Sequence, residues 1–118
     1  MSNLYCAGNA LPAAFLSEPC YNLVYLELAA CRLTSLPPGL PTLVPNLRAL
    51  NLNYNFLDDT ALRALEGLSR LTKLTVIGSR LQGTKALVRV LRGCPDAEVV
   101  DLRYVPSFRP FPAVFVRP

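Results

Sequence analysis

Histidine is absent from the sequence, and its four cysteines are widely separated. Histidine is the usual general base and the commonest metal ligand, so its absence removes the first candidate for both roles. The four cysteines, Cys6, Cys20, Cys31 and Cys94, include no Cys-x-x-Cys pair of the kind that holds zinc. A cysteine nucleophile would also lack the imidazole that activates it. We therefore predict no catalytic residues, no metal site and no cofactor.

Long apolar runs and export signals are also missing. No apolar run approaches the roughly 18 residues that a membrane-spanning helix needs. The first residues lack a basic region followed by an apolar core, and the chain holds no Asn-x-Ser/Thr glycosylation site. The cysteines are scattered rather than grouped at a terminus, which suits free thiols in a reducing compartment. We expect an intracellular protein that does not enter a membrane.

Leucine, in contrast, recurs at one fixed spacing along the whole chain. The spacing is Leu-x-x-Leu-x-Leu-x-x-Asn/Cys-x-Leu, and its copies begin at residues 1, 23, 47, 71 and 97. The copies at 23 and 47 match every fixed position, whereas the copy at 97 has decayed. This pattern and period resemble those of the leucine-rich repeat family. Such repeats stack around one continuous core, which accounts for a hydrophobic content of 52% in so short a chain.

The resemblance implies an α/β fold, a leucine-rich-repeat solenoid of about five repeats. Each Leu-x-Leu segment is expected to form a short strand with its leucines inward, because strand side chains alternate. The strands form a parallel sheet on the concave face, and short helices and extended segments lie on the convex face. Four prolines within residues 36–45 predict an extended or short 3₁₀ crossing. Helices are predicted over 61–65, capped by residues 58–60, and over 85–92, which follows Thr84.

The Asn/Cys position of each repeat is expected to turn inward and to bind backbone groups of the bend. Losing such a buried partner costs about 1–3 kcal/mol. In the last copy this position holds Val105, whose side chain cannot hydrogen-bond, so we expect the regular turn to end there. The predicted structural ladder consists of Asn9, Cys31, Asn55 and Ser79.

The pattern places the repeats in residues 1–107 and leaves 108–118 as a Pro/Phe-rich C-terminal cap or tail. We expect this tail to pack over the last repeat as a lid, and a Pro/Phe-rich partner motif is the alternative. Met1 already occupies the first pattern position, with no polar cap ahead of it, and terminal repeats need caps. We therefore expect the chain to be a fragment of a longer protein. The alternative is that a partner or a second copy covers its open N-terminal edge.

Without a catalytic site, a binding surface is the expected functional site, and the concave face is the best candidate. Tyrosine and arginine combine contact area with hydrogen bonding, which favours them as binding anchors. Small residues at neighbouring outward positions leave the face shallow, which suits a protein segment or peptide lying across it. The candidate partner-binding residues are Tyr5, Tyr25, Glu27, Asn51, Asn53, Tyr54, Lys73, Thr75, Asp101, Arg103 and Tyr104.

A narrower resemblance lies between Leu47 and Phe108. This stretch of sequence is similar to the C-terminal repeats of fungal spindle-pole-body scaffolds. These scaffolds belong to the septation initiation and mitotic exit networks and are relatives of animal centriolin. The resemblance implies a non-catalytic protein-interaction module within a mitotic signalling scaffold, located in the cytoplasm or at the spindle pole body or centrosome. The segments that carry it are Leu50–Asn55, Gly67–Leu74, Gly78–Leu81, Val90–Leu91 and Val100–Arg103.

Two other functions remain open at this point. One is a substrate-recognition or regulatory module of a ubiquitin ligase or phosphatase. The other is weak nucleic-acid binding through Lys85, Arg89 and Arg92, which fall on one stripe of the predicted convex helix. The net charge of +4 without a block of like charges, and the few aromatic residues near this stripe, disfavour nucleic acid. A protein or peptide is the expected partner.

Overall fold

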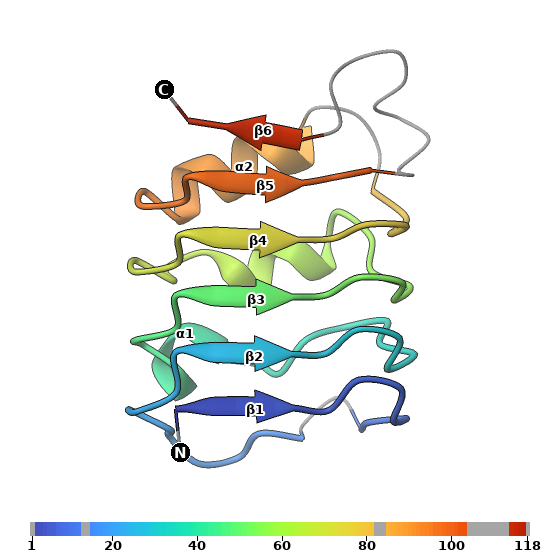
Figure 1. The fold of residues 1–118 in the computed structure, drawn as a ribbon, viewed down its shortest axis with the longest axis vertical. Helices are drawn as coiled ribbons and strands as arrows, with labels where there is room; N and C mark the ends of the chain where they lie inside the picture. The colour runs from blue at the N-terminus through green and yellow to red at the C-terminus, as the bar shows by residue number, and fades with distance from the viewer. Residues whose placement is uncertain (1, 13–14, 82–84, 104–113, 118) are drawn as a thin grey trace.

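The computed structural model describes residues 2–12, 15–81, 85–103 and 114–117, and in these ranges the chain winds as a coil with a sheet along one side (Figure 1). The sheet has six strands in the order β1-β2-β3-β4-β5-β6. The strands are β1 Asn3–Tyr5, β2 Tyr25–Glu27, β3 Ala49–Asn51, β4 Lys73–Thr75, β5 Val99–Asp101 and β6 Val114–Val116.

The first five strands are parallel, and their register follows the repeat. Leu4, Leu26, Leu50, Leu74 and Val100 lie opposite one another across the sheet. Backbone hydrogen bonds continue the pairing just beyond the strands, as where the amide of residue 28 donates to the carbonyl of residue 51 at 2.8 Å. The parallel sheet predicted from the leucine spacing is therefore present.

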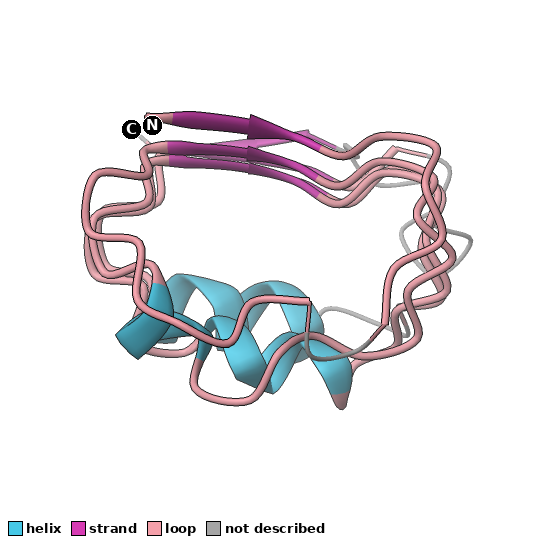
Figure 2. Cartoon of the chain, turned by 90° about the horizontal axis from the view of Figure 1, so that it is seen from below, coloured by secondary structure: helices cyan, strands magenta, loops and turns pink. Residues whose placement is uncertain are grey.

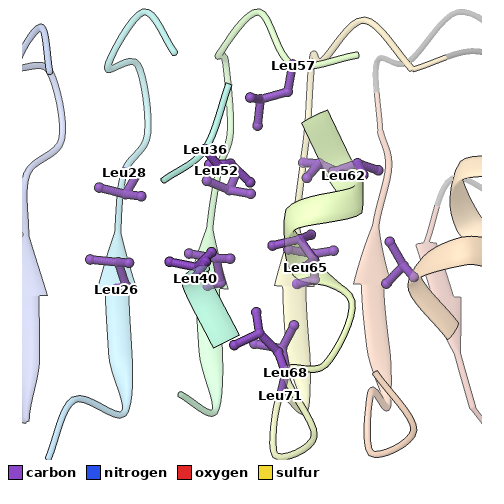
Figure 3. Close-up of a cluster of buried hydrophobic side chains, with 14 of the residues drawn as sticks. Leu26, Leu28, Leu36, Leu40, Leu52, Leu57, Leu62, Leu65, Leu68 and Leu71 are labelled. Atoms are coloured by element: carbon purple, nitrogen blue, oxygen red, sulfur yellow. The ribbon is translucent and has the colours of Figure 1, made fainter. Parts of the chain in front are cut away.

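Three short helical segments form the layer opposite the sheet (Figure 2). They are α1 Leu40–Leu43, the 3₁₀ helix η1 Ala61–Leu65 and α2 Lys85–Gly93. The space between the two layers is filled by leucines that both layers contribute (Figure 3). Leu26 and Leu52 come from the sheet side, and Leu62 and Leu65 come from η1; each is at most 1% exposed. Burying one such side chain stabilises the fold by about 1.5–3 kcal/mol, so the regular leucines are the main source of stability.

The prediction for the crossing segment of residues 36–45 is wrong in one respect. The structure forms a single α-helical turn there, α1, instead of an extended or 3₁₀ segment. Pro41 lies in the first turn of α1, where a backbone N–H has no intrahelical acceptor and its absence costs nothing. Gly39 precedes the helix with a φ of 70°, a conformation that glycine adopts without strain. The position of the prolines, and not their number, decided the local structure.

The other two helical segments form where they were predicted, with different detail. Residues 61–65 are 3₁₀-helical, and the amide of Ala61 is capped by the Asp58 carboxylate at 3.0 Å, while Thr60 makes no side-chain cap. In α2, Val90 is buried and Leu91 packs against the core. Thr84, the predicted cap of α2, lies outside the described residues.

A last strand, which the sequence pattern did not predict, extends the sheet beyond the fifth repeat. β6 pairs antiparallel with β5, so that Phe115 lies opposite Val100 and packs against the core. The Arg117 side chain donates from Nε to the carbonyl of Ala97 at 2.8 Å and holds the end of this strand. Residues 104–113, which include Val105 and Tyr104, lie outside the described residues.

Gly93 marks a close contact between consecutive turns of the coil, and its replacement by alanine should destabilise the protein. A Cβ at this position would lie 2.8 Å from the Cα of Glu66, and the Gly93 carbonyl accepts a hydrogen bond from the amide of Gly67 at 2.9 Å. Because backbone atoms cannot yield as a flexible side chain does, we expect Gly93→Ala to cost about 1–3 kcal/mol in chemical denaturation. Arg92→Ala, at an exposed position of the same helix, is the control and should cost less than about 0.5 kcal/mol.

Candidate functional site

The solvent-facing side of β1–β5, which we call the open sheet face, corresponds to the face predicted as concave. Because the strands are parallel and in register, equivalent outward side chains line up in rows across it. One row contains Asn3, Tyr25, Ala49, Lys73 and Val99, and the next contains Tyr5, Glu27, Asn51, Thr75 and Asp101.

A polar network lies at the centre of this face, over β2 and β3. Glu27 Oε2 accepts hydrogen bonds from the Tyr25 hydroxyl and from Asn51 Nδ2, the latter at 3.0 Å. Glu27 Oε1 accepts from the amide of Ala29 at 3.3 Å. The rings of Tyr5 and Tyr25 lie 5.4 Å apart between centroids, tilted by 54°, a favourable edge-to-face type of contact. These contacts hold four candidate side chains, those of Tyr5, Tyr25, Glu27 and Asn51, in fixed positions before any partner arrives, which lowers the entropic cost of binding.

The same network changes the acidity of Tyr25. Its hydrogen bond to the Glu27 carboxylate, together with partial burial, raises the pKa of the Tyr25 hydroxyl to about 12. Folding therefore favours the neutral hydroxyl. This contribution to stability is complete below the unfolded-state pKa of about 10 and is lost as the pH rises through about 12.

This shift predicts a distinct tyrosine titration. In spectrophotometric titration of tyrosinate absorbance, one ionisation step should occur near pH 12 and should vanish in Tyr25→Phe. In Glu27→Gln the step should move down toward pH 10, because the charged acceptor is gone. A high-pH step that survives unchanged in Glu27→Gln would show that the carboxylate does not hold the hydroxyl.

Beside the network the face is hollowed between β2 and β4. The hollow has a volume of about 70 Å³, and the small residue Ala49 lines it together with Tyr25 and Lys73. Thr75 Oγ1 is buried there, and none of the described residues hydrogen-bonds to it. A buried hydroxyl without a partner costs free energy, and this oxygen has almost no accessible surface, so a group in the hollow would reach it only if the Thr75 side chain turned. The lining residues are Tyr25, Ala49, Leu50, Asn51, Lys73 and Thr75.

Other candidates on this side already serve the fold. Asn53 Oδ1 accepts from the amide of Ile77 at 2.8 Å, and Asn51 Oδ1 accepts from the amide of Asn53 at 3.0 Å. Asp101 is only 8% exposed and forms a two-pronged ion pair with the Arg103 guanidinium, at 2.9 Å for the shortest contact. These residues shape the ends of the strands, and fewer of their polar groups are left for a partner.

The ladder position shows how a side chain can hold two turns together. Asn55 is 1% exposed and uses its amide fully. Its Oδ1 accepts from the backbone amides of Cys31 and Leu33 at 2.9 and 3.0 Å, and its Nδ2 donates to the carbonyls of Leu28 and Leu52 at 2.8 and 3.1 Å. The amide thus ties its own turn to that of the preceding repeat.

The remaining ladder residues make fewer side-chain hydrogen bonds than Asn55. Cys31 is buried and its thiol donates to the carbonyl of Cys6 at 3.0 Å. Asn9 is exposed and donates to the carbonyls of Cys6 and Ala7. Ser79 is buried, and its hydroxyl has no hydrogen-bond partner among the described residues, contrary to the expected role. The serine side chain is shorter than that of asparagine, so it does not reach the backbone of the neighbouring turn.

Two aromatic side chains lie just beyond β3, at the corner between the open sheet face and the loops. Tyr54 is 57% exposed, and its ring rests on Gly78, where an added Cβ would lie 2.9 Å from Cδ1. Phe56 is 42% exposed and carries the Arg80 guanidinium over its ring at 4.7 Å. Sequence analysis missed Phe56, although it is an apolar residue at an outward position of a complete repeat. Tyr104 lies outside the described residues.

The predicted basic stripe on the convex helix is partly neutralised. Arg89 forms an ion pair with Glu66 of the preceding turn at 3.1 Å. Arg92 is exposed, and the side chain of Lys85 lies outside the described residues. The described part of the stripe therefore offers a single unpaired cation, a weak basis for binding a phosphate backbone.

The remaining reactive and accessible groups are the cysteine thiols and the free edge of β1. All four cysteines are free, and burial raises the pKa of Cys94 to about 11, so its thiolate is not available near neutral pH. The described residues contain no group of three potential metal ligands and no helix long and apolar enough to cross a bilayer. At the start of the sheet, β1 pairs with β2 alone, and a hollow of about 340 Å³ lies beside it, lined by Leu4, Pro19, Cys20, Tyr21, Asn22 and Leu23.

Two comparisons bear on these surfaces. A family model described as leucine rich repeat matches residues 21–81. The septation initiation network scaffold protein cdc11 of Schizosaccharomyces pombe is 30% identical over 113 residues, which are 95% of this chain and 11% of that protein. The chain thus spans about 11% of the length of this relative.

Proposed function

The chain belongs to the leucine-rich repeat family, and we propose that it is a non-catalytic protein-interaction module that holds a peptide or helix of its partner on the open sheet face. The observation that carries the proposal is the fixed polar network of Tyr25, Glu27 and Asn51, next to a hollow that Ala49, Lys73 and Thr75 help to line. Tyrosine is enriched among the residues that contribute most to binding energy.

We propose further that the module belongs to an intracellular mitotic signalling scaffold at the spindle pole body. Support comes from the similarity to a septation initiation network scaffold over nearly the whole chain. In such a scaffold the repeats would dock one component while other segments recruit the rest. A module of this kind needs a stable surface and no chemistry, which agrees with the rigid, histidine-free face.

Affinity capture with two matched variants tests the binding surface. The open-face variant Tyr5→Ser/Lys73→Glu removes one exposed tyrosine and reverses one exposed cation. The control Val88→Ser/Arg63→Glu also removes one exposed apolar side chain and reverses one exposed cation, outside the face. Tyr5 and Val88 are 65% and 43% exposed, and both variants change the net charge equally. Each is purified, checked by its melting curve and used as bait in extracts of mitotic cells from the source organism.

We expect a set of proteins that the wild-type chain and the control retain and the open-face variant loses. Spindle-pole or septation-network proteins in this set would support the scaffold proposal. Ligase or phosphatase subunits would instead favour the regulatory-module alternative. If the open-face variant retains every specific protein, the open sheet face is not the binding surface.

We also propose that the open edge of β1 allows self-association. An unpaired strand edge exposes backbone donors and acceptors that a second strand can satisfy, and the adjoining hollow is lined by apolar side chains. Sedimentation equilibrium should show a mass that rises with concentration in the wild type and stays monomeric in Tyr21→Asp, which places a charge in this hollow. A monomeric wild type across the accessible concentration range would refute this part of the proposal.

A further inference from the structure

We propose a second binding surface, separate from the open sheet face, that takes an acidic, extended peptide. It lies on the loops that follow the strands, which stack on one side of the coil (Figure 2). The surface, which we call the Arg-Phe-Arg row, consists of Arg32, Phe56 and Arg80, with Tyr54 beside it. The three residues occupy the same outward position in three consecutive repeats, between the buried pattern positions on either side.

The backbone fixes this row. The amide of Phe56 donates to the carbonyl of Leu33 at 2.8 Å, and the amide of Arg80 donates to the carbonyl of Leu57 at 2.9 Å. These bonds hold each turn against the preceding one. Since strands pair at about 4.8 Å, the backbones of the two arginines are spaced by roughly 10 Å, with Phe56 between them.

Arg32 is held in an unusual conformation. Its φ is 58°, in the left-handed region that residues other than glycine seldom adopt. The Asn55 side chain holds the backbone on both sides of Arg32, because its Oδ1 accepts hydrogen bonds from the amides of Cys31 and Leu33. The buried ladder therefore determines where the Arg32 side chain begins.

The row presents positive charge that the described residues do not neutralise. Arg32 and Arg80 are exposed, and neither takes part in the two ion pairs found within the described ranges. The Arg80 guanidinium rests over the Phe56 ring, 4.7 Å from its centroid, which fixes its position through a cation–π contact. Phe56 and Tyr54, 42% and 57% exposed, add apolar area beside the two charges.

The spacing indicates the form of the ligand. In a polyproline II peptide, side chains three residues apart lie on the same face, about 9 Å from each other. Acidic residues at this interval match the backbone spacing of the two arginines. Arginine pairs carboxylates with two parallel hydrogen bonds, which gives such a contact its direction.

A peptide fits this surface better than a nucleic acid does. A nucleic acid carries a phosphate at every nucleotide, while the row offers two cations. Asp58, exposed at the next outward position beyond Phe56, would repel a continuous phosphate backbone. An acidic peptide can place a neutral residue opposite Asp58.

Fluorescence anisotropy with a labelled (Glu-Pro-Leu)₄ peptide tests the proposal on the full chain at low salt. The charge-reversal variant Arg32→Glu/Arg80→Glu is compared with Arg63→Glu/Arg70→Glu, which makes the same change in charge at exposed positions elsewhere. We expect the row variant to bind roughly tenfold more weakly than the wild type, because two exposed charge pairs are lost, and the control to bind as the wild type does. A (Lys-Pro-Leu)₄ peptide should not bind.

Three results would overturn the proposal: no binding of the acidic peptide by the wild type, equal weakening in both variants, or tighter binding of an oligothymidine than of the peptide. If the row variant does not fold, the site can be tested by the amide shifts that the peptide induces in the NMR spectrum of the wild type. They should appear at Arg32, Phe56 and Arg80, and their absence would refute the site. The open-face variant changes different residues, so its effect on partner binding tests the proposed function alone. The row variant tests the second binding surface alone.

Discussion

Leu52→Asp is expected to abolish the cooperative folding of the chain. Leu52 is fully buried in the centre of the core, between the sheet and the helical layer (Figure 3). The substitution removes a buried leucine side chain, which costs about 2–5 kcal/mol, and buries a carboxylate with no cation near it, which costs several kcal/mol more. The sum is comparable to the whole stability of a small domain, about 5–15 kcal/mol. Circular dichroism during heating should show no cooperative melt.

The matched control is Asn53→Asp, which introduces the same charge one residue further along. Asn53 points outward, and its Oδ1 accepts from the amide of Ile77, a bond that an aspartate can also accept. We expect this variant to melt within a few degrees of the wild type. A normal cooperative melt for Leu52→Asp would contradict the inward direction of Leu52 and with it the alternation along every strand.

Asn55→Ala is expected to have the second-largest effect, about 3–5 kcal/mol in chemical denaturation. The substitution leaves the buried amides of Cys31 and Leu33 and two carbonyls without their partner. Each unsatisfied buried group costs about 1–3 kcal/mol.

The control for this prediction is Asn9→Ala at the equivalent position of the first repeat. Asn9 is exposed, and water can replace the two hydrogen bonds that its side chain donates. We expect a cost below about 1 kcal/mol. Equal costs at the two positions would mean that burial of the ladder does not determine its strength.

The sheet and its register were predictable because leucine spacing reports them directly. A side chain that must lie in a continuous core recurs once per repeat, and the intervening residues then face outward. The same logic located Asn55 before its contacts were known. It does not fix how far a shorter side chain reaches, and the Ser79 hydroxyl has no hydrogen-bond partner within the part of the chain that the structure describes.

The convex segments were less predictable because local rules compete there. Counting prolines between residues 36 and 45 predicted no α-helix, yet Pro41 in the first turn is compatible with one. β6 carries no leucine pattern, and its pairing with β5 depends on a distant segment of the chain. Periodicity contains no information about such pairing.

On the open sheet face, alternation predicted which residues point outward but not which of them bind each other. The hydrogen bonds of Glu27 to Tyr25 and Asn51 join two strands and depend on side-chain rotamers. The ion pair between Asp101 and Arg103 joins two further candidates, and alternation along the strand does not indicate that pairing either. The composition of the face was therefore predictable, while its rigid centre was not.

The most direct test of the binding proposal is an NMR titration of the isotopically labelled chain with the purified partner from affinity capture. The proposal predicts that amide shifts concentrate in residues 3–5, 25–29, 49–53 and 73–77, around the Glu27 network and the Thr75 hollow. Shifts confined to η1 and α2, with the strands unchanged, would contradict it and place the binding surface on the opposite layer.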